Sequence, residues 1–157
     1  MKIISIFFAL FVSMSSLAGE NDSISLEIKL VNVMTSASAI YKCENSRIKV
    51  YQSKNGKSYR LVSTKRLSEG KQSVITNSII QLLDNYNFQS EEFSDSRVID
   101  GYDWVATISY KNKVITYKVL NCCNSKIDQV IKVINAELKR KKLIFETGLM
   151  YKDNPCE

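Results

Sequence analysis

The sequence predicts an α+β protein, with an antiparallel β-sheet of about five strands and two helices packed on one face of it. Two patterns predict this class. Several segments alternate apolar and polar residues with a period of two, which is typical of half-buried strands, and two others carry apolar residues at helical spacing. One layer of helices on one face of a sheet is the simplest arrangement that buries both kinds of apolar face.

The expected strands form a first strand and two hairpins. In the first strand, Leu26, Ile28 and Leu30 alternate with polar residues. Asn55-Gly56 predicts the turn of the first hairpin, because both residue types tolerate positive φ. In the second hairpin, Gly101 is expected to relax the entry of the strand, and Trp104 to anchor the sheet against a helix. The predicted strands cover residues 25–33, 46–53, 58–66, 102–110 and 114–121.

A helix is predicted after each hairpin. The apolar stripe of the first helix consists of Val74, Ile75, Ile79, Leu82, Leu83 and Tyr86. The second helix is expected to start at Ser125 as N-cap, with Asp128 in a partial capping box, and its stripe consists of Ile127, Val130, Ile131, Ile134 and Leu138. The hairpin–helix unit thus occurs twice, over 46–86 and 97–142. No residue-level repeat accompanies it, so an internal duplication stays an open alternative.

The first eighteen residues predict export. Lys2 is followed by a compact apolar run from Ile3 to Val12, and Ser16-Leu17-Ala18 provides the small residues of a signal-peptidase site. The run is too short to span a bilayer. We therefore expect a cleaved signal peptide at 1–18 and a single exported domain at 19–157, in the periplasm or outside the cell.

The four cysteines predict two disulfides in an oxidising compartment. A bond between the adjacent residues Cys122 and Cys123 would be strained. Each of the two pairings that remain joins Cys43 to one of them and Cys156 to the other, which would pin the C-terminal tail. A zinc or redox site is the alternative, but the sequence has no CxxC motif.

Composition excludes several chemistries. The chain has no histidine, which removes Ser-His-Asp, Cys-His and imidazole–zinc sites. It has no glycine-rich phosphate loop. Lys and Arg number 22 against 16 Asp and Glu, a modest excess spread along the chain that does not predict nucleic-acid binding. No metal, cofactor or catalytic residue is predicted.

Two charged segments are candidate binding sites. Glu91, Glu92 and Asp95 lie in an acidic loop over 88–96, and Asp103 follows at the start of a strand. Lys139, Arg140, Lys141 and Lys142 close the second helix, where they suit the helix dipole and provide weak contact with an anionic surface. The sheet face opposite the helices is expected to carry Arg60, Thr64, Asp103, Thr107 and Ser109, open to solvent or a partner.

These features predict a non-enzymatic protein-binding module, such as an inhibitor or an immunity protein that blocks a toxin or enzyme outside the cytoplasm. The acidic residues Glu91, Glu92, Asp95 and Asp103 would provide its binding surface. A small-molecule or envelope-surface binding protein is the alternative. A carboxylate-based enzyme ranks last, because it needs a second, opposed carboxylate-rich segment.

Overall fold

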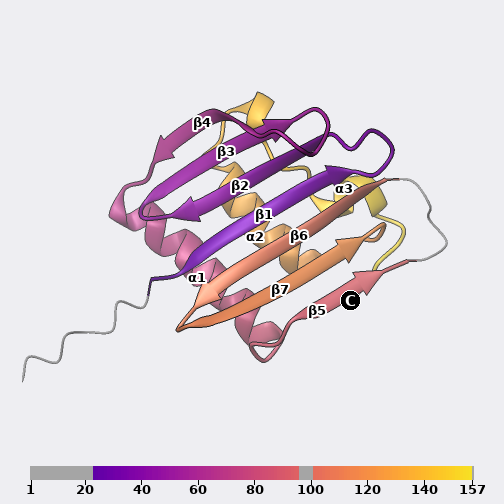
Figure 1. The fold of residues 1–157 in the computed structure, drawn as a ribbon. Helices are drawn as coiled ribbons and strands as arrows, with labels where there is room; N and C mark the ends of the chain where they lie inside the picture. Colours follow the sequence, from indigo (N-terminus) through magenta and orange to yellow (C-terminus); the bar gives the residue numbers. More distant parts are fainter. Residues whose placement is uncertain (1–22, 96–100, 157) are drawn as a thin grey trace, which may run out of the picture.

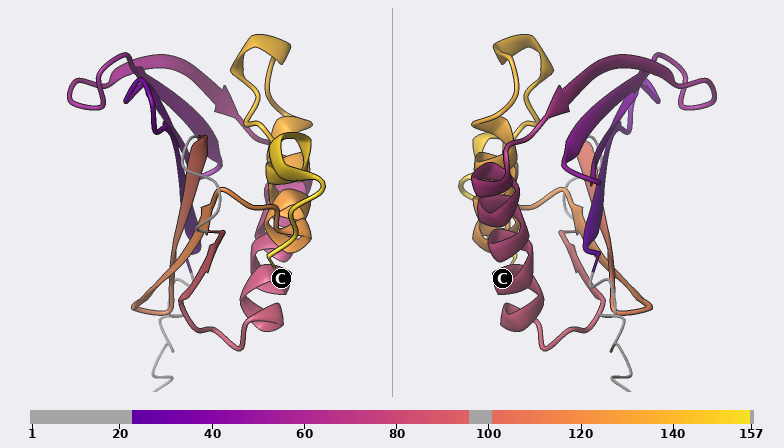
Figure 2. Two further views of the ribbon diagram at one scale, coloured as in Figure 1. Left: turned by 90° about the vertical axis from the view of Figure 1, so that its right-hand side faces the viewer. Right: turned by 90° about the vertical axis from the view of Figure 1, so that its left-hand side faces the viewer.

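The computed structural model describes residues 23–95 and 101–156 as an α+β fold with two layers. One layer is a seven-stranded sheet in the order β4-β3-β2-β1-β6-β7-β5 (Figure 1). Helices α1 and α2 and the C-terminal segment, residues 136–156, form the second layer on one face of the sheet, and none of the described residues covers the opposite face (Figure 2). All neighbouring strands are antiparallel except β5 and β7, which are parallel.

The elements have the following bounds: β1 Ser25–Asn32, β2 Ser38–Glu44, β3 Arg47–Ser53, β4 Arg60–Arg66, α1 Glu69–Asn85, β5 Glu91–Ser94, β6 Tyr102–Tyr110, β7 Lys113–Leu120, α2 Ser125–Asn135, the 3-10 turn η1 Arg140–Lys142, and α3 Thr147–Tyr151. The signal peptide predicted at 1–18 lies outside the described residues. No helix in the described part of the chain is both long and apolar enough to cross a membrane.

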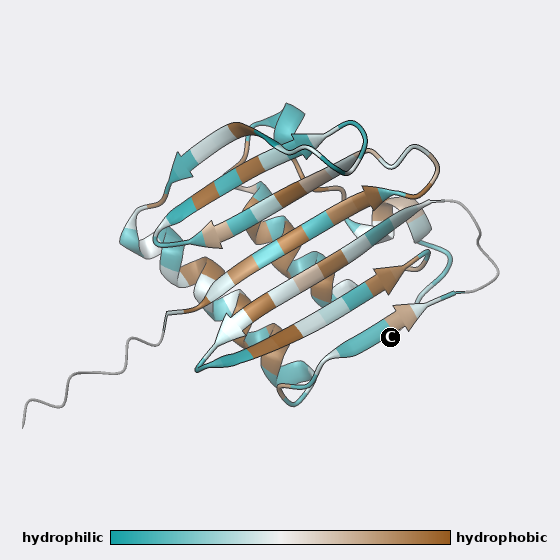
Figure 3. Cartoon of the chain, in the orientation of Figure 1, coloured by the Kyte–Doolittle hydropathy of each residue, from teal (hydrophilic) through white to brown (hydrophobic). Residues whose placement is uncertain are grey.

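Alternation along the strands builds the sheet side of the core. The inward residues of the central strand β1, Leu26, Ile28 and Leu30, are buried, as the sequence predicts. Brown and teal bands alternate along the strands in Figure 3, which is the same pattern seen as hydropathy. The helices supply the other side of the core with the buried residues Ile75, Ile79, Leu82, Leu83, Ile127, Val130, Ile131 and Ile134. Val74, expected in the first stripe, is exposed instead.

The strand count of about five is too low, because β2 and β5 are additional strands. Strand β2 begins within the predicted connector at 35–39, and its inward residues Ala39, Tyr41 and Cys43 form a weakly apolar stripe. Strand β5 lies in the segment predicted as an acidic loop. It is an edge strand that pairs only with β7, so it needs little apolar surface to form.

The two predicted hairpins, β3–β4 and β6–β7, are confirmed. The connection between the strands is short and tight in the second hairpin and longer in the first. Lys111 and Asn112 both have positive φ and form a tight two-residue turn between β6 and β7. Between β3 and β4 the loop spans residues 54–59, and only Gly56 of the Asn55-Gly56 pair has positive φ. The Oδ1 atom of Asn55 instead accepts hydrogen bonds within the loop.

Helix α2 begins and ends differently from the prediction. Its N-cap is Asn124, whose side chain accepts a hydrogen bond from the Ile127 amide, and not Ser125. The helix ends at Asn135, and Lys139–Lys142 do not extend it. The Asn135 side chain binds the backbone of Ile144 through both its amide oxygen and its amide nitrogen, and so turns the chain away from the helix.

One of the two predicted disulfides is present, between Cys122 and Cys156, and it pins the C-terminal tail as expected. The pairing predicted for Cys43 is wrong, because Cys43 is a free, buried thiol on β2. The register explains this. Cys43 pairs with Leu26, Leu26 with Ile108 and Ile108 with Ile115, so the residue of β7 in the row of Cys43 is three strand spacings away. Cys122 lies seven residues after Ile115, beyond the other end of β7. Such a separation, roughly 20 Å or more, is far beyond the reach of a disulfide.

Candidate functional site

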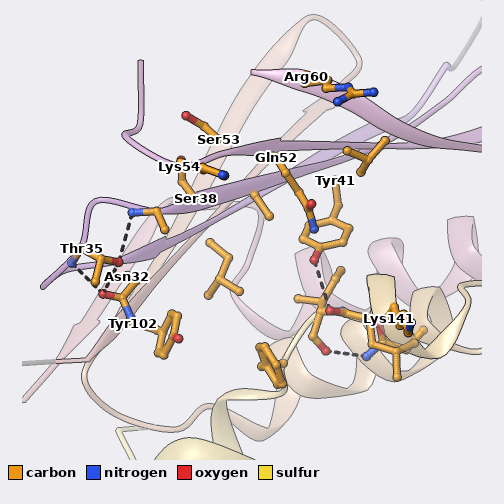
Figure 4. A pocket seen from close by; sticks show the side chains of 18 of the residues that line it. Asn32, Thr35, Ser38, Tyr41, Gln52, Ser53, Lys54, Arg60, Tyr102 and Lys141 are labelled. Atoms are coloured by element: carbon orange, nitrogen blue, oxygen red, sulfur yellow. Dashed lines mark hydrogen bonds between the residues drawn. The ribbon is translucent and has the colours of Figure 1, made fainter. Parts of the chain in front are cut away.

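A groove of about 1200 Å³ lies between the sheet and the C-terminal segment. One wall comes from the ends of strands β1 to β4. The other wall comes from residues 140–149, which include η1, an irregular stretch over 143–146 and the start of α3. Figure 4 shows labelled side chains from both walls around the groove. Its volume is slightly above the range of about 300–1000 Å³ that is usual for small-molecule pockets.

The strand register places four residues of the sheet wall in one row. Leu30 pairs with Ala39, Ala39 with Gln52, and Gln52 with Arg60, so these four residues form one row across four strands. All four line the groove. The row runs from an aliphatic residue on the central strand to a cation on the edge strand, so the polarity of the wall changes along its length.

A β-bulge turns Arg60 into the groove. The pairing of β3 with β4 shifts between Val50 and Tyr51, which inserts an extra residue on β4. Because of this shift, Leu61 pairs with the outward Tyr51, and Arg60 pairs with Gln52 on the groove side. The expectation that Arg60 lies on the open face of the sheet is therefore wrong. That prediction assumes uninterrupted alternation along the strand, and the bulge breaks it.

Side chains from the core hold the backbone of the second wall in place. The Tyr41 hydroxyl donates to the carbonyl of Leu143 at 3.2 Å, and Trp104 Nε1 donates to the carbonyl of Phe145 at 2.9 Å. Asn135 Nδ2 donates to the carbonyl of Ile144 at 2.7 Å, and Asn135 Oδ1 accepts from its amide at 2.8 Å. The wall thus has fixed hydrogen-bond partners although it is neither helix nor strand over 143–146.

Asp128 completes this anchoring. The residue is only 6% exposed, and its carboxylate accepts from the Thr147 amide at 2.6 Å, the Thr147 hydroxyl at 3.0 Å and the Gly148 amide at 2.7 Å. A buried carboxylate needs such donors, because desolvation without them is costly. Asp128 is therefore an anchor of the C-terminal wall and not the capping-box residue that the sequence predicts.

The sequence alone assigns no functional role to the anchor side chains Tyr41, Trp104 and Asn135, and assigns Asp128 only to a capping box. A signal exists: Asp128 and Asn135 lie three residues before and four residues after the buried Ile131, so both fall on the inward face of α2. Trp104 anchors the sheet against a helix, as the sequence predicts, through an edge-to-face contact with Tyr151 of α3 at a centroid distance of 6.0 Å. Its indole also donates to the Phe145 carbonyl, a contact that the sequence does not reveal.

The charges around the groove are mostly positive. Lys54, Arg60, Arg140 and Lys141 line it, and none of them forms an ion pair with any described carboxylate. Glu146 is the one carboxylate among the lining residues, and it lies 3.6 Å from Lys132. Two members of the predicted basic cluster, Arg140 and Lys141, thus belong to the groove. Lys139 precedes them, and Lys142 Nζ donates to the carbonyl of Val62.

The lining is suited to binding. Burial raises the pKa of Tyr41 to about 12, so its hydroxyl stays protonated and continues to donate to Leu143. A two-carboxylate mechanism would need a partner for Glu146, and the described lining residues supply none. Among the described residues, no group of three or more potential metal ligands comes together. The groove can enclose an apolar body and attract negative charge.

The predicted acidic site is dispersed. Glu91 pairs in register with the inward Tyr117, whereas Glu92 projects outward and forms an ion pair with Lys118 at 2.8 Å. Asp95 follows the end of β5, and its amide donates to the Leu120 carbonyl.

Asp103, the fourth predicted acidic residue, lies on β6, separated from β5 by β7, and partial burial raises its pKa. Glu92 and Asp103 thus share the uncovered face without touching, and Thr64, Thr107 and Ser109 also alternate onto that face.

The chain matches no known protein-family model, and a search of curated proteins finds no similar sequence.

Proposed function

We propose that this protein is an exported, non-enzymatic binding protein whose groove takes a small molecule with an elongated apolar body. The observation that carries the proposal is the groove of about 1200 Å³ between the sheet and the C-terminal segment. Its floor and walls include Leu30, Ala39, Leu143, Ile144 and Phe145. Apolar lining with a few convergent polar groups is typical of ligand-binding pockets.

The walls are held by contacts within the chain itself. One wall is a paired sheet, and the other is held by hydrogen bonds from Tyr41, Trp104, Asp128 and Asn135. A preformed site loses less conformational entropy on binding, which favours affinity. Export is supported by the signal-peptide pattern of 1–18 and by the Cys122–Cys156 disulfide, a bond typical of oxidising compartments.

The test is to fill the groove with a side chain. Ala39 is partly buried in the groove wall, and Ile40, the next residue on β2, projects to the opposite face of the sheet. We expect the protein to bind the neutral fluorescent probe N-phenyl-1-naphthylamine with saturable 1:1 stoichiometry. Ala39→Phe should weaken this binding at least about tenfold, a loss of about 1.4 kcal/mol, and the matched control Ile40→Phe should leave it unchanged.

Thermal unfolding of both variants checks that the fold is retained. The proposal is wrong if the wild-type protein does not bind the probe, or if Ala39→Phe binds it as well as Ile40→Phe does.

A protein-binding module, such as an inhibitor or an immunity protein, is the second candidate. The uncovered sheet face and the acidic edge strand β5 favour it (Figure 2), because an edge strand offers unpaired backbone groups to a partner. Affinity capture from secreted and envelope fractions tests it. Reversing the charges of Glu91, Glu92 and Asp95 should release a captured partner without lowering Tm, and retention of the partner by this variant would exclude these residues as the site.

A further inference from the structure

We propose that the ligand of the groove is an anionic amphiphile: a single alkyl chain that ends in one oxyanionic headgroup, bound as a monomer. This inference rests on the proposed function and narrows it to a ligand class.

The first step is the charge imbalance. The groove is lined by four cations without described ion-pair partners and by one carboxylate that is already close to a lysine. Clustered exposed charges of one sign on a concave surface raise the local concentration of ions of the opposite sign, so this lining favours anions. A cationic or zwitterionic ligand would gain less from this lining than an anion does.

The second step is the placement of two of these cations. Arg60 comes from strand β4 and Lys141 from the C-terminal segment, and Figure 4 shows them on opposite walls at the same side of the groove. Arg60 is there because of the β-bulge described above. Its guanidinium has the planar donor geometry that suits a carboxylate or phosphate oxygen pair, and Lys141 adds a point charge from the facing wall.

The third step is the apolar surface. Figure 4 shows Tyr102 on the side of the groove away from Arg60 and Lys141. Tyr102 and Phe145 are in ring contact, with a centroid distance of 6.4 Å, and both line the groove together with Leu30 and Leu149. Phe145 is 52% exposed and Leu149 is 70% exposed, although both are large apolar side chains. An alkyl chain lying along this surface would remove it from water and would place its headgroup toward the end of the groove that carries Arg60 and Lys141.

The test compares twelve-carbon ligands that differ in the headgroup. Dodecanoate, dodecyl phosphate and dodecyltrimethylammonium are titrated below their critical micelle concentrations, and dodecanol below its solubility limit, with calorimetry as the readout. We expect both anions to bind at least about tenfold more tightly than the cationic ligand, with an affinity that falls as salt rises. Comparing the affinities of dodecanoate and dodecyl phosphate shows which oxyanion the site prefers.

The matched variants separate local charge from net charge. Arg60→Gln with Lys141→Gln removes one arginine and one lysine from the groove. Arg66→Gln with Lys29→Gln removes the same two residue types from the uncovered face. We expect the groove pair to weaken dodecanoate about tenfold, since each exposed ion pair contributes modestly, and to leave dodecanol unchanged. The control pair should bind both ligands as the wild type does.

The inference is overturned if the anions and the cationic ligand bind equally, or if the two double variants behave alike, while neutral-probe binding stays sensitive to Ala39→Phe. In that outcome the groove binds apolar molecules without charge selection, and the proposed function stands. Failure of the wild-type protein to bind any probe would remove the proposed function and this inference together. Binding to anionic vesicles without uptake of monomeric dodecanoate would also overturn the inference, because it would indicate surface attraction only.

Discussion

Replacing Asp128 by Asn should loosen the wall of the groove and destabilise the fold. The carboxylate accepts three hydrogen bonds, from the Thr147 amide, the Thr147 hydroxyl and the Gly148 amide, at 2.6, 3.0 and 2.7 Å. An asparagine oxygen in the Oδ1 position can keep the two bonds to Thr147. Its NH₂ group then faces the Gly148 amide, so one bond is lost and two donors confront each other.

The magnitude follows from these contacts. A hydrogen bond to a charged group contributes about 1.5–3 kcal/mol net, and a buried unsatisfied donor adds a penalty of similar size. Removing the charge also removes the cost of desolvating it, which offsets part of the loss. We expect Asp128→Asn to lower the free energy of unfolding by about 2 kcal/mol. In a domain of this size that corresponds to a fall in Tm of roughly 8 °C.

Two measurements check this prediction. Thermal unfolding gives Tm, and acrylamide quenching of Trp104, the single tryptophan, reports on the wall because its indole donates to the Phe145 carbonyl. Asp84→Asn on the exposed side of α1 is the matched control, and it should change stability by less than about 0.5 kcal/mol. If Asp128→Asn matches Asp84→Asn in both Tm and quenching, the anchoring role assigned to Asp128 is wrong.

Three further predictions concern the disulfide, a close backbone contact and a carboxylate. Cys156→Ser should cost about 2–4 kcal/mol, and Cys43→Ala clearly less, because only Cys156 is bonded; equal losses in urea unfolding would contradict this assignment. Gly101→Ala should destabilise the protein, because its Cβ would lie 1.7 Å from the Tyr151 hydroxyl oxygen. The loss should be partly restored in the double variant with Tyr151→Phe, and additive losses would refute the contact. Burial raises the pKa of Asp103 above its ordinary 3.8, so ionisation disfavours the folded state. Asp103→Asn should match the wild-type Tm well below pH 3.8 and exceed it at pH 7, and an unchanged difference across this range would contradict the raised pKa.

The sequence predicts those elements whose burial follows a regular period. Trp104, Ala106 and Ile108 are buried at every second position of β6, so this strand is evident from its residues alone. The stripe of β2 is harder to recognise because Ala39 and Cys43 are small. Strand β5 has a single inward apolar residue, Phe93, because an edge strand covers only the margin of the core. Periodicity cannot detect a strand that buries so little.

The groove depends on contacts that no local pattern contains. Arg60 faces the groove because one bulge reverses the alternation of β4, and a bulge leaves no clear mark in residue types. The bond from Tyr41 to Leu143 joins residues 102 positions apart, and that from Trp104 to Phe145 joins residues 41 apart. The polar residues Asp128 and Asn135 inside an otherwise apolar helix face are the one signal in the sequence that such an anchored segment exists.

The anchors and the groove lining make stability and binding separable. Asp128 does not line the groove but accepts hydrogen bonds from the backbone of its C-terminal wall, so its replacement should reduce stability and ligand affinity together. Arg60 and Lys141 are exposed and carry no described ion pair, so their replacement should reduce affinity for anions at constant Tm. Ala39→Phe should reduce affinity for every ligand, because it removes volume rather than charge. These three outcomes differ for one physical reason: shape, charge and support of the groove come from different side chains.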